Sequence, residues 1–413
     1  MRREVRRTDT LRVSTWSALS AAIALKSLYS DGREDDADAV QIEEFASVQT
    51  MPLLPFVFFA ESESGIDPRY TQLSPDAVES FSIQRVHGAD KLAAYHHVLN
   101  IIGRRLRDTP SAMVTLTGCN ADVGPEAGNT GLSQRRAEAV RAYLVNTWGI
   151  PDQRIRIESR NLPETAANPE TSDGAQEHRR VEIASDNPAI TAPIVTTEAL
   201  RSATPPALRL RLRTERPGAI ESWSVEILRG AQNVKTFQGK GSLPPTLDWD
   251  LDGALPTLME SDRTMTCRLT LIDGSGRTVT SSRQIDVQVL TLAKKRATKV
   301  ADKELFRVSL APFDVRSSEI PSANQVLVEQ ARGHLNAASI VYITGWADRS
   351  GKAEQNQAVA EARAKRTAEA LRLPFNIQTM RGYGNAAIYD QNLPEGRMYT
   401  RAVDIVVERP VAP

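Results

Sequence analysis

Near the C-terminal end of the chain, one acidic residue lies in a loop bounded by glycines and is followed by an arginine in a helical stretch. The acid is Asp348 in TGWADRSGK, and the arginine is Arg363, fifteen residues further on. A carboxylate on a glycine-flexed loop reaches a cation without steric cost from its neighbours. A planar guanidinium binds a carboxylate through two parallel hydrogen bonds, which a lysine cannot do. These residue types are therefore suited to binding charged groups.

Signatures of bond-breaking chemistry are missing from the sequence. It contains no G-x-S-x-G turn, no clustered His and Cys, and no metal-ligand spacing. The neighbours His96 and His97 face different sides of a predicted helix, and the two cysteines, Cys119 and Cys267, are far apart. We therefore expect no enzymatic activity, no cofactor and no metal.

The loop that holds Asp348 has a counterpart earlier in the chain. VTLTGCNADVGPEAGNTGLSQRRAEAV, which begins at Val114, matches VYITGWADRSGKAEQNQAVAEARAKRT, which begins at Val341. The offset is a constant 227 residues, as four matched pairs show: Gly118 and Gly345, Gly124 and Gly351, Asn129 and Asn356, Arg136 and Arg363. Such self-similarity indicates a duplicated domain.

The same order of elements is predicted around both copies. Each begins with an extended apolar segment, PFVFFAESES or PFDVRSSEI, and continues with an amphipathic helix, from Leu92 to Leu106 or from Leu327 to Leu335. A short strand, the glycine-bounded loop, the helix that carries the arginine and two further strands follow. This order predicts an α+β sandwich, βαβαββ, with its helices on one face of a small sheet.

Between the copies, residues 193–289 contain short alternating strands separated by Asp-Gly and Gly-x-Gly turns, which predicts an all-β sandwich. We therefore expect five parts: an N-terminal extension (1–47), a first α+β domain (48–188), the β-sandwich (189–292), a charged linker (293–304) and a second α+β domain (305–410).

The first residues have a basic head and a weakly apolar stretch, residues 18–25, which Lys26 interrupts. A secretory signal requires a longer apolar run, so the extension is either a weak signal or strands left from a preceding domain. No run of 18 apolar residues occurs, so no spanning helix is expected. The 51 basic and 51 acidic residues give zero net charge, and nothing indicates a nucleic-acid partner.

Both copies resemble the OmpA-like C-terminal domain family, with its G-x-T-D-x-x-G loop, its Asn, its L-S-x-x-R-A helix start and its closing N-R-R-V-E-I strand. The resemblance covers about residues 52–186 and 305–409, and the middle region resembles an Ig-like module.

The family resemblance implies non-covalent binding of peptidoglycan through the diaminopimelate of its peptide stem. The motif's Asp would hold the ammonium and its Arg the carboxylate of this zwitterion. In the second copy the matching residues are Asp348 and Arg363, together with Asn356, Gly345 and Gly351.

The first copy departs from the motif at the acid. Its fourth loop position is Ala121, and Asp122 is displaced by one residue, whereas Arg136 and Asn129 keep their places. We therefore expect a weaker site there. The first copy retains the serine expected to cap the helix as Ser133, whereas the second has Ala360 at this position.

These observations predict a non-enzymatic bacterial envelope protein in the periplasm, associated with the outer membrane or the cell wall. It would tether an outer-membrane or periplasmic assembly to peptidoglycan, mainly through its second OmpA-like domain. The alternative is an interaction scaffold that binds other envelope proteins and in which wall binding is secondary or lost.

Overall fold

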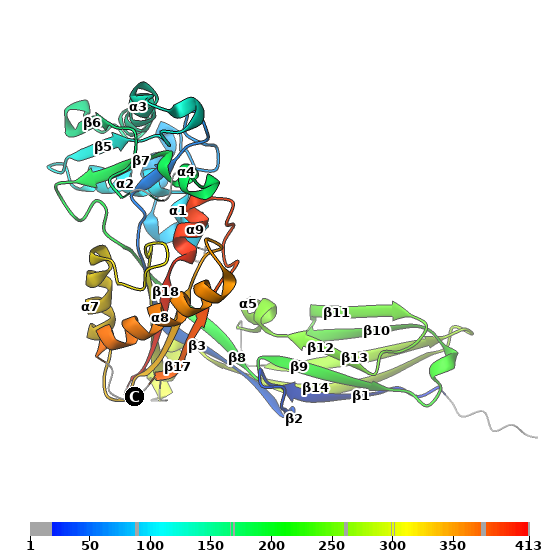
Figure 1. The fold of residues 1–413 in the computed structure, drawn as a ribbon. Coiled ribbons are helices and arrows are strands. Elements are labelled where there is room, and N and C mark those ends of the chain that lie inside the picture. Colours follow the sequence, from blue (N-terminus) through cyan, green and yellow to red (C-terminus); the bar gives the residue numbers. More distant parts are fainter. Residues whose placement is uncertain are drawn as a thin grey trace, which may run out of the picture. The chain divides into compact units, whose positions relative to one another are not determined.

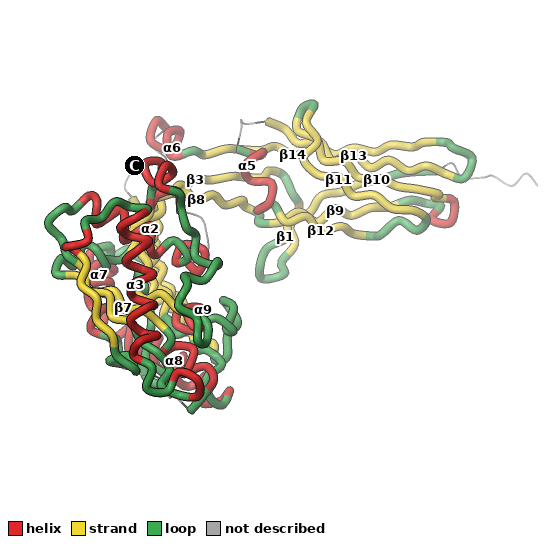
Figure 2. Tube along the Cα trace, turned by 90° about the horizontal axis from the view of Figure 1, so that it is seen from above, coloured by secondary structure: helices red, strands yellow, loops and turns green. Residues whose placement is uncertain are grey.

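A computed structural model describes residues 19–86, 91–165, 167, 170–259, 263–298, 300, 302–372 and 377–411. The chain divides into two compact units (Figure 1). One contains the chain up to Phe45 together with residues 200–300, and the other contains residues 46–199 and 301–413. The first unit is formed almost wholly of strands, whereas the second mixes helices and strands (Figure 2).

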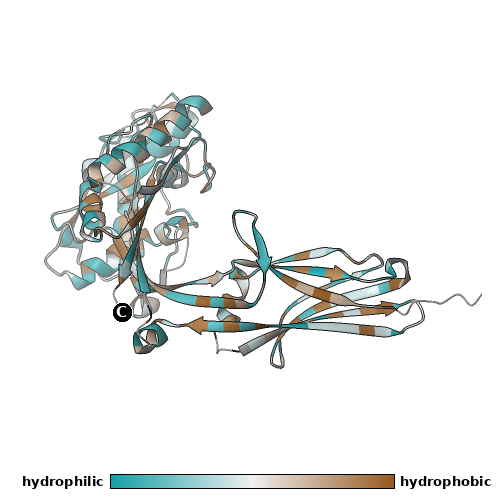
Figure 3. Cartoon of the chain, turned by 90° about the horizontal axis from the view of Figure 1, so that it is seen from below, coloured by the Kyte–Doolittle hydropathy of each residue, from teal (hydrophilic) through white to brown (hydrophobic). Residues whose placement is uncertain are grey.

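The first unit is a β-sandwich whose two sheets enclose one hydrophobic core. One sheet has the order β12–β9–β1–β2, and the other contains β11, β10, β13, β14 and the first half of β3. Apolar and polar side chains alternate along these strands, as the colours in Figure 3 show, because successive residues face opposite sides of a strand. The strands are β1 (Ala22–Leu28), β2 (Glu34–Asp36), β3 (Ala39–Met51), β8 (Ile194–Thr204), β9 (Ala207–Arg213), β10 (Ile220–Arg229), β11 (Gln232–Lys240), β12 (Thr246–Asp250), β13 (Arg263–Asp273) and β14 (Thr278–Leu290).

The N-terminal strands complete this sandwich, which corrects the expectation of a separate extension over residues 1–47. β1 pairs antiparallel with β9 along its whole length, and Ala39–Glu43 of β3 pair parallel with β14. Of the possible signal, residues 1–18 lie outside the described residues, whereas Ala22–Leu25 of its weakly apolar stretch belong to β1. Strand pairing over so long a sequence separation leaves no local signal, which is why the boundary at residue 47 was misplaced.

The charged stretch expected as a linker contains a helix of the first unit, α6 (Leu292–Thr298). Its Lys295 is buried, donates from Nζ to the Glu44 carbonyl at 2.8 Å and lies over the Phe45 ring. Lysine covers apolar surface with its stem while its ammonium keeps a polar partner, so a charged sequence here packs against the sandwich. A further short helix, α5 (Leu255–Leu258), precedes β13.

The second unit contains two regions with the same order of elements, which we call the first lobe (residues 52–186) and the second lobe (residues 302–411). The first lobe has β4 (Phe56–Phe58), α1 (Lys91–Tyr95), α2 (Val98–Asp108), β5 (Val114–Gly118), α3 (Thr130–Asn146), β6 (Ile155–Ser159), α4 (Ser172–His178) and β7 (Arg180–Ser185). The second lobe has β15 (Asp302–Leu310), α7 (Gln325–Gly333), β16 (Ile340–Trp346), α8 (Ala353–Leu371), β17 (Ile377–Tyr383), α9 (Pro394–Thr400) and β18 (Val403–Val411). Short 3-10 helices span Pro75–Ser80, Ile83–Val86, Gly124–Glu126, Asp152–Arg154, Pro217–Ala219, Asp252–Ala254 and Ser322–Asn324.

The strand orders of the lobes correspond, β4–β7–β5–β6 in the first and β15–β18–β16–β17 in the second. In each lobe the strand before the loop pairs parallel with the strand after the arginine helix and antiparallel with the closing strand. In the second lobe β15 also pairs parallel with Ala46–Thr50 of β3.

Three elements differ from the sequence expectation. In the second lobe the first strand is residues 302–310, before the expected segment PFDVRSSEI, which is a loop. The helix expected from Leu92 to Leu106 is two helices, because the chain turns at His96 and His97. The short helices α4 and α9, directly before the closing strands, were not expected.

Helices α4 and α9 hold equivalent positions in the two lobes and contact each other, and α9 also contacts α1 (Figure 1). Met398 and Tyr399 of α9 belong to the same buried core as Tyr95 of the first lobe, and the two tyrosine rings meet edge to face at 5.7 Å. The two lobes therefore share part of one hydrophobic core.

Candidate functional site

Arg363 lies in α8 with its guanidinium held by three backbone carbonyls. Nε donates to the Ser317 carbonyl at 2.8 Å, Nη1 to Trp346 at 2.7 Å and Nη2 to Asp314 at 2.9 Å. The guanidinium also lies 5.1 Å from the centre of the Phe313 ring. The side chain is only 1% exposed, and burial lowers the pKa of Arg363 to about 10. We call these three oxygens the carbonyl cage.

Arg136 of the first lobe has an equivalent carbonyl cage. Its nitrogens donate to the carbonyls of Glu63, Cys119 and Ala60 at 2.8, 3.0 and 3.0 Å, in the same order from Nε to Nη2. Phe59 lies under this guanidinium at 5.5 Å. The two arginines that sequence comparison aligned therefore have the same local environment.

The predicted glycines allow each arginine helix to approach its strand closely. A Cβ on Gly345 would lie 2.0 Å from the Ala360 carbonyl oxygen, and one on Gly118 would lie 1.8 Å from that of Ser133. Any larger residue would displace α8 or α3 and move the guanidinium. Gly351 has a φ of 123°, which glycine adopts without strain.

Asp348 is 3% exposed and forms a salt bridge with Arg401, which directly follows α9. Its Oδ1 accepts from the Ser350 amide at 3.0 Å, and its Oδ2 accepts from the Ser350 hydroxyl at 3.1 Å and from Arg401 Nη1 at 2.9 Å. Asp348 forms no direct hydrogen bond with Arg363 in the part of the chain that the structure describes. Phe313 links Asp348 to Arg363. The Phe313 carbonyl accepts from Nε of Arg401, the partner of Asp348, and the Phe313 ring lies under the Arg363 guanidinium.

The first lobe supplies a second carboxylate to Arg401. Glu177 of α4 accepts from Nη1 and Nη2 of Arg401, both at 3.0 Å, and from Arg397 Nε at 3.2 Å. Burial acts to lower the pKa of Arg401, but Glu177 and Asp348 outweigh this, so its pKa is raised. Arg401 is thus bound on one side by its own lobe and on the other by the first lobe.

A more exposed pair extends this contact. Asp173 of α4 binds Arg349, the residue after Asp348, with Nη2 to Oδ1 at 2.9 Å and Nε to Oδ2 at 3.2 Å. The Arg349 guanidinium lowers the pKa of Asp173. The predicted loop and α4 are therefore joined by three arginines and three acids: Arg349, Arg397, Arg401, Asp173, Glu177 and Asp348.

In the first lobe, Arg136 has a carboxylate partner that the sequence comparison did not identify. Glu126 is fully buried, and its Oε1 accepts from Arg136 Nη2 at 2.6 Å and from the Ser62 amide at 2.8 Å. Its Oε2 accepts from the Ala121 amide at 2.9 Å and lies 3.4 Å from Arg179 Nε. Burial acts to raise the pKa of Glu126, but Arg136 and the two amides outweigh it, so the pKa is lowered.

The other predicted residues have structural contacts. Asp122 has a positive φ of 52°, and its Oδ1 accepts from the Gly128 amide at 2.7 Å, so it stabilises the loop and does not contact Arg136. Asn129 caps α3 by accepting from the Leu132 amide at 3.0 Å. Asn356 lies inside α8 and donates to the Asp348 carbonyl at 2.9 Å, which fixes the loop.

Ser133 is not the helix cap that the sequence suggested. It is the fourth residue of α3, and its buried hydroxyl has no hydrogen-bond partner among the described residues. The loss of this serine in the second lobe therefore removes no cap. The α8 N-cap residue, Lys352, makes no side-chain cap hydrogen bond.

Sequence reasoning did not identify Glu126, Glu177 and Arg401, nor the neighbouring Arg349, Arg397 and Asp173. Glu126 lies in the matched loop, two residues after Gly124, and Arg401 is the remaining basic residue of the closing motif, so both had a local signal. Glu177 had none, because it acts on the other lobe.

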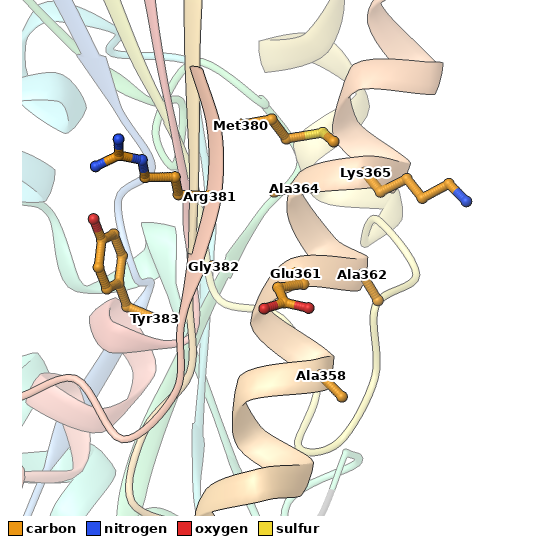
Figure 4. Close-up of a pocket in the computed structure, with 9 residues that line it drawn as sticks. All are labelled: Ala358, Glu361, Ala362, Ala364, Lys365, Met380, Arg381, Gly382 and Tyr383. Carbon is orange, nitrogen blue, oxygen red and sulfur yellow. The ribbon is translucent and has the colours of Figure 1, made fainter.

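A groove of about 600 Å³ lies between α8 and β17 (Figure 4). Met380 points toward the helix, whereas Arg381 and Tyr383 point away from it. A Cβ on Gly382 would lie 2.4 Å from the Glu361 nitrogen, so this strand also approaches its helix closely. None of the predicted site residues lines the groove.

Among the described residues, no group of three or more His, Cys, Asp or Glu side chains is placed to hold a metal ion. No helix among them is long and apolar enough to span a membrane.

Comparison with known proteins finds a match to the OmpA family over residues 88–180. The peptidoglycan-binding protein ArfA of Mycobacterium bovis is 33% identical over 96 residues, which are 23% of this chain and 29% of that protein. Outer membrane porin F of Pseudomonas aeruginosa is 36% identical over 77 residues, 19% of this chain and 22% of the porin. The matches therefore span less than a third of either relative.

Among solved structures, the peptidoglycan-associated lipoprotein of Burkholderia pseudomallei aligns at 19% identity with a TM-score of 0.22, over 32% of this chain and 90% of the lipoprotein. The family match covers α1, α2, β5, α3, β6 and α4, which include Arg136 and its helix. Residues 88–180 are therefore an OmpA-family domain.

Proposed function

We propose that this chain binds peptidoglycan without covalent attachment, as a structural protein of the bacterial cell envelope. The observation that carries the proposal is the unused hydrogen-bonding capacity of Arg363. A guanidinium has five N–H groups, and the carbonyl cage accepts three of those of Arg363. One N–H on each terminal nitrogen has no acceptor among the described residues. Two parallel N–H groups of this kind are suited to a carboxylate.

Asp348 supplies the opposite charge next to this arginine. A carboxylate has about four acceptor positions, and Ser350 and Arg401 use three of those of Asp348. The remaining position suits an ammonium. The stem-peptide diaminopimelate carries a free ammonium and a free carboxylate on one carbon, so Asp348 and Arg363 are the proposed binding residues, with Asn356, Gly345 and Gly351 shaping the loop.

Such a site binds weakly by itself. Hydrogen bonds to charged groups contribute about 1.5–3 kcal/mol each, and the burial of Asp348 and Arg363 means that part of the contact with α4 must open first. A polymeric wall compensates because many stems are presented close together.

The same proposal covers the organisation of the chain. Both lobes are taken as OmpA-like domains, and the β-sandwich of the first unit is taken as an Ig-like module. The corresponding order of elements and the equivalent carbonyl cages of Arg136 and Arg363 support the duplication. The mycobacterial relative named as peptidoglycan-binding supports the ligand. A periplasmic location at the outer membrane or wall follows from this ligand.

Co-sedimentation of the full chain with insoluble peptidoglycan tests the proposal. We expect binding to walls that contain diaminopimelate and little binding to walls that contain lysine in its place. Asp348→Asn, which keeps the side-chain shape, should reduce the bound fraction at least fivefold, whereas Asp122→Asn in the first lobe should leave it unchanged. Equal binding of both wall types, or of wild type and Asp348→Asn, would refute the proposed site.

A second candidate function is a scaffold for other envelope proteins. The observation that favours it is the contact of α4 with the second lobe, because Glu177 and Asp173 occupy Arg401 and Arg349 around the proposed site. In that case the chain would sediment with neither wall type, and purified outer-membrane or periplasmic proteins would bind to it with the same affinity in wild type and Asp348→Asn.

A further inference from the structure

We propose that Glu126 is an internal ligand of the first lobe, whose carboxylate occupies the position that a ligand carboxylate would take on Arg363 in the second lobe. This inference rests on the proposed function only in its comparison with the second site. Its other premises are contacts within the first lobe.

Arg136 and Arg363 have equivalent contacts in the two lobes. Both use Nε, Nη1 and Nη2 in the same order on three backbone carbonyls, and both lie over a phenylalanine ring. Their remaining N–H groups therefore face corresponding positions. In the first lobe the Glu126 oxygens take these groups, with Oε1 at 2.6 Å from Nη2 and Oε2 at 3.5 Å from Nη1.

The first lobe lacks the acid that the second lobe has in its loop. In the second lobe Asp348 binds Arg401. The first-lobe counterpart of Asp348 is Ala121, and that of Arg401 is Arg179, because each of these arginines lies two residues before a valine of the closing strand, Val181 or Val403. Ala121 has no carboxylate, but the Glu126 Oε2 lies 3.4 Å from Arg179 Nε. Glu126 is therefore the partner of Arg179, as Asp348 is of Arg401. On Arg136 it takes the place of a ligand carboxylate.

Backbone amides of the first lobe hold the Glu126 carboxylate. Glu126 is fully buried. The Ser62 amide donates to its Oε1, and the Ala121 amide donates to its Oε2. A buried ion pair is stable only when hydrogen bonds satisfy its remaining atoms, and these amides do so. In the second lobe the residue aligned with Glu126 is Ala353, which is exposed at the start of α8.

The consequence is a functional difference between the lobes. The first lobe satisfies its arginine within the chain and has no requirement for a zwitterionic ligand, so each molecule presents one site to the wall. Removal of the Glu126 carboxylate should convert the first lobe into a site for small carboxylates.

Chemical rescue tests this directly. Glu126→Ala removes a fragment equivalent to acetate, so acetate should raise the melting temperature (Tm) of the full-length variant in a concentration-dependent manner, at constant ionic strength. Acetamide, which has the same shape without the charge, should not. Wild type and the matched control Glu61→Ala, which removes the half-exposed partner of Arg179, should show no acetate-dependent rise.

An acetate effect of equal size in wild type, or none in Glu126→Ala, would overturn the inference. If Glu126→Ala is not recovered folded, Glu126→Gln keeps the side-chain shape and removes the charge. Its Tm should lie below that of wild type at pH 7, and the difference should shrink as the pH falls and Glu126 is protonated. A Glu126→Gln variant as stable as wild type at pH 7 would equally refute it. The readout requires no peptidoglycan, so it is independent of the sedimentation result.

Discussion

Arg401 Nη1 donates to Asp348 Oδ2 at 2.9 Å inside the second unit, where both side chains are almost fully buried. The same nitrogen donates to Glu177 Oε1 of the first lobe at 3.0 Å. Asp348, which the sequence predicts to bind ligand, thus also belongs to the contact between the lobes. A ligand ammonium at Asp348 would act on this contact, because it would share the carboxylate with Arg401.

Glu177→Gln should destabilise the second unit. The substitution leaves Arg397 and Arg401 buried with one carboxylate fewer, and removing one partner of a buried ion pair costs about 3–5 kcal/mol. The midpoint of urea unfolding, followed by a probe in the second unit, measures this. Glu329→Gln breaks an exposed pair with Arg332 and should cost less than about 1 kcal/mol. Equal midpoints for the two variants would contradict the buried role of Glu177.

Arg363→Met should destabilise the second lobe through its carbonyl cage. Three buried carbonyls would lose their donor, and each such loss costs about 1–3 kcal/mol. Arg363→Lys should be less destabilising because an ammonium can still donate to one of them. Arg366 lies on the same helix, is about half exposed and pairs with Glu319, so Arg366→Met is the matched control for thermal unfolding. The prediction fails if Arg366→Met is as harmful as Arg363→Met.

Gly345→Ala should lower the Tm because α8 contacts β16 at this residue. The added Cβ would lie 2.0 Å from the Ala360 carbonyl oxygen, and overpacking of this kind costs about 1–3 kcal/mol. Gly333→Ala adds the same methyl group where no atom lies within 4 Å. A Tm for Gly345→Ala at or above that of Gly333→Ala would show that α8 can shift without cost.

The stability of the second unit should fall at acidic pH as Asp404 is protonated. Burial acts to raise its pKa, but Lys91 of the first lobe, Ser309 and Trp346 outweigh this, so the folded pKa lies below the usual 3.8. Its stabilising contribution is therefore present above pH 3.8 and is lost as the pH falls through the folded pKa.

The pH dependence of unfolding midpoints between pH 6 and pH 3 in Asp404→Asn checks this expectation. The variant should lose less stability than wild type as the pH falls through this range. Glu158→Gln, at an exposed position of β6, should retain the wild-type slope. An unchanged slope in Asp404→Asn would exclude Asp404 as the source of the acid sensitivity.

The sequence by itself determined the local elements and the positions of the two arginines. Strand alternation and helical spacing depend on neighbouring residues, so β5, β16, α3, α8 and most strands of the sandwich were predictable. The offset of 227 residues also determined that Arg136 and Arg363 would lie at corresponding places, since each is carried by a helix that follows a glycine-bounded loop.

Only the tertiary structure decided which charged groups meet. Glu177 reaches Arg401 across 224 residues of sequence. Ala22 of β1 pairs with Arg213 of β9, which is also far away in the sequence, so neither contact has a local pattern. Glu126 was visible in the sequence, but its pairing with Arg136 depends on burial and on the two amides that surround it. A buried charge requires a partner, and the partner is whichever group the packing brings within hydrogen-bond distance, which periodicity and spacing do not specify.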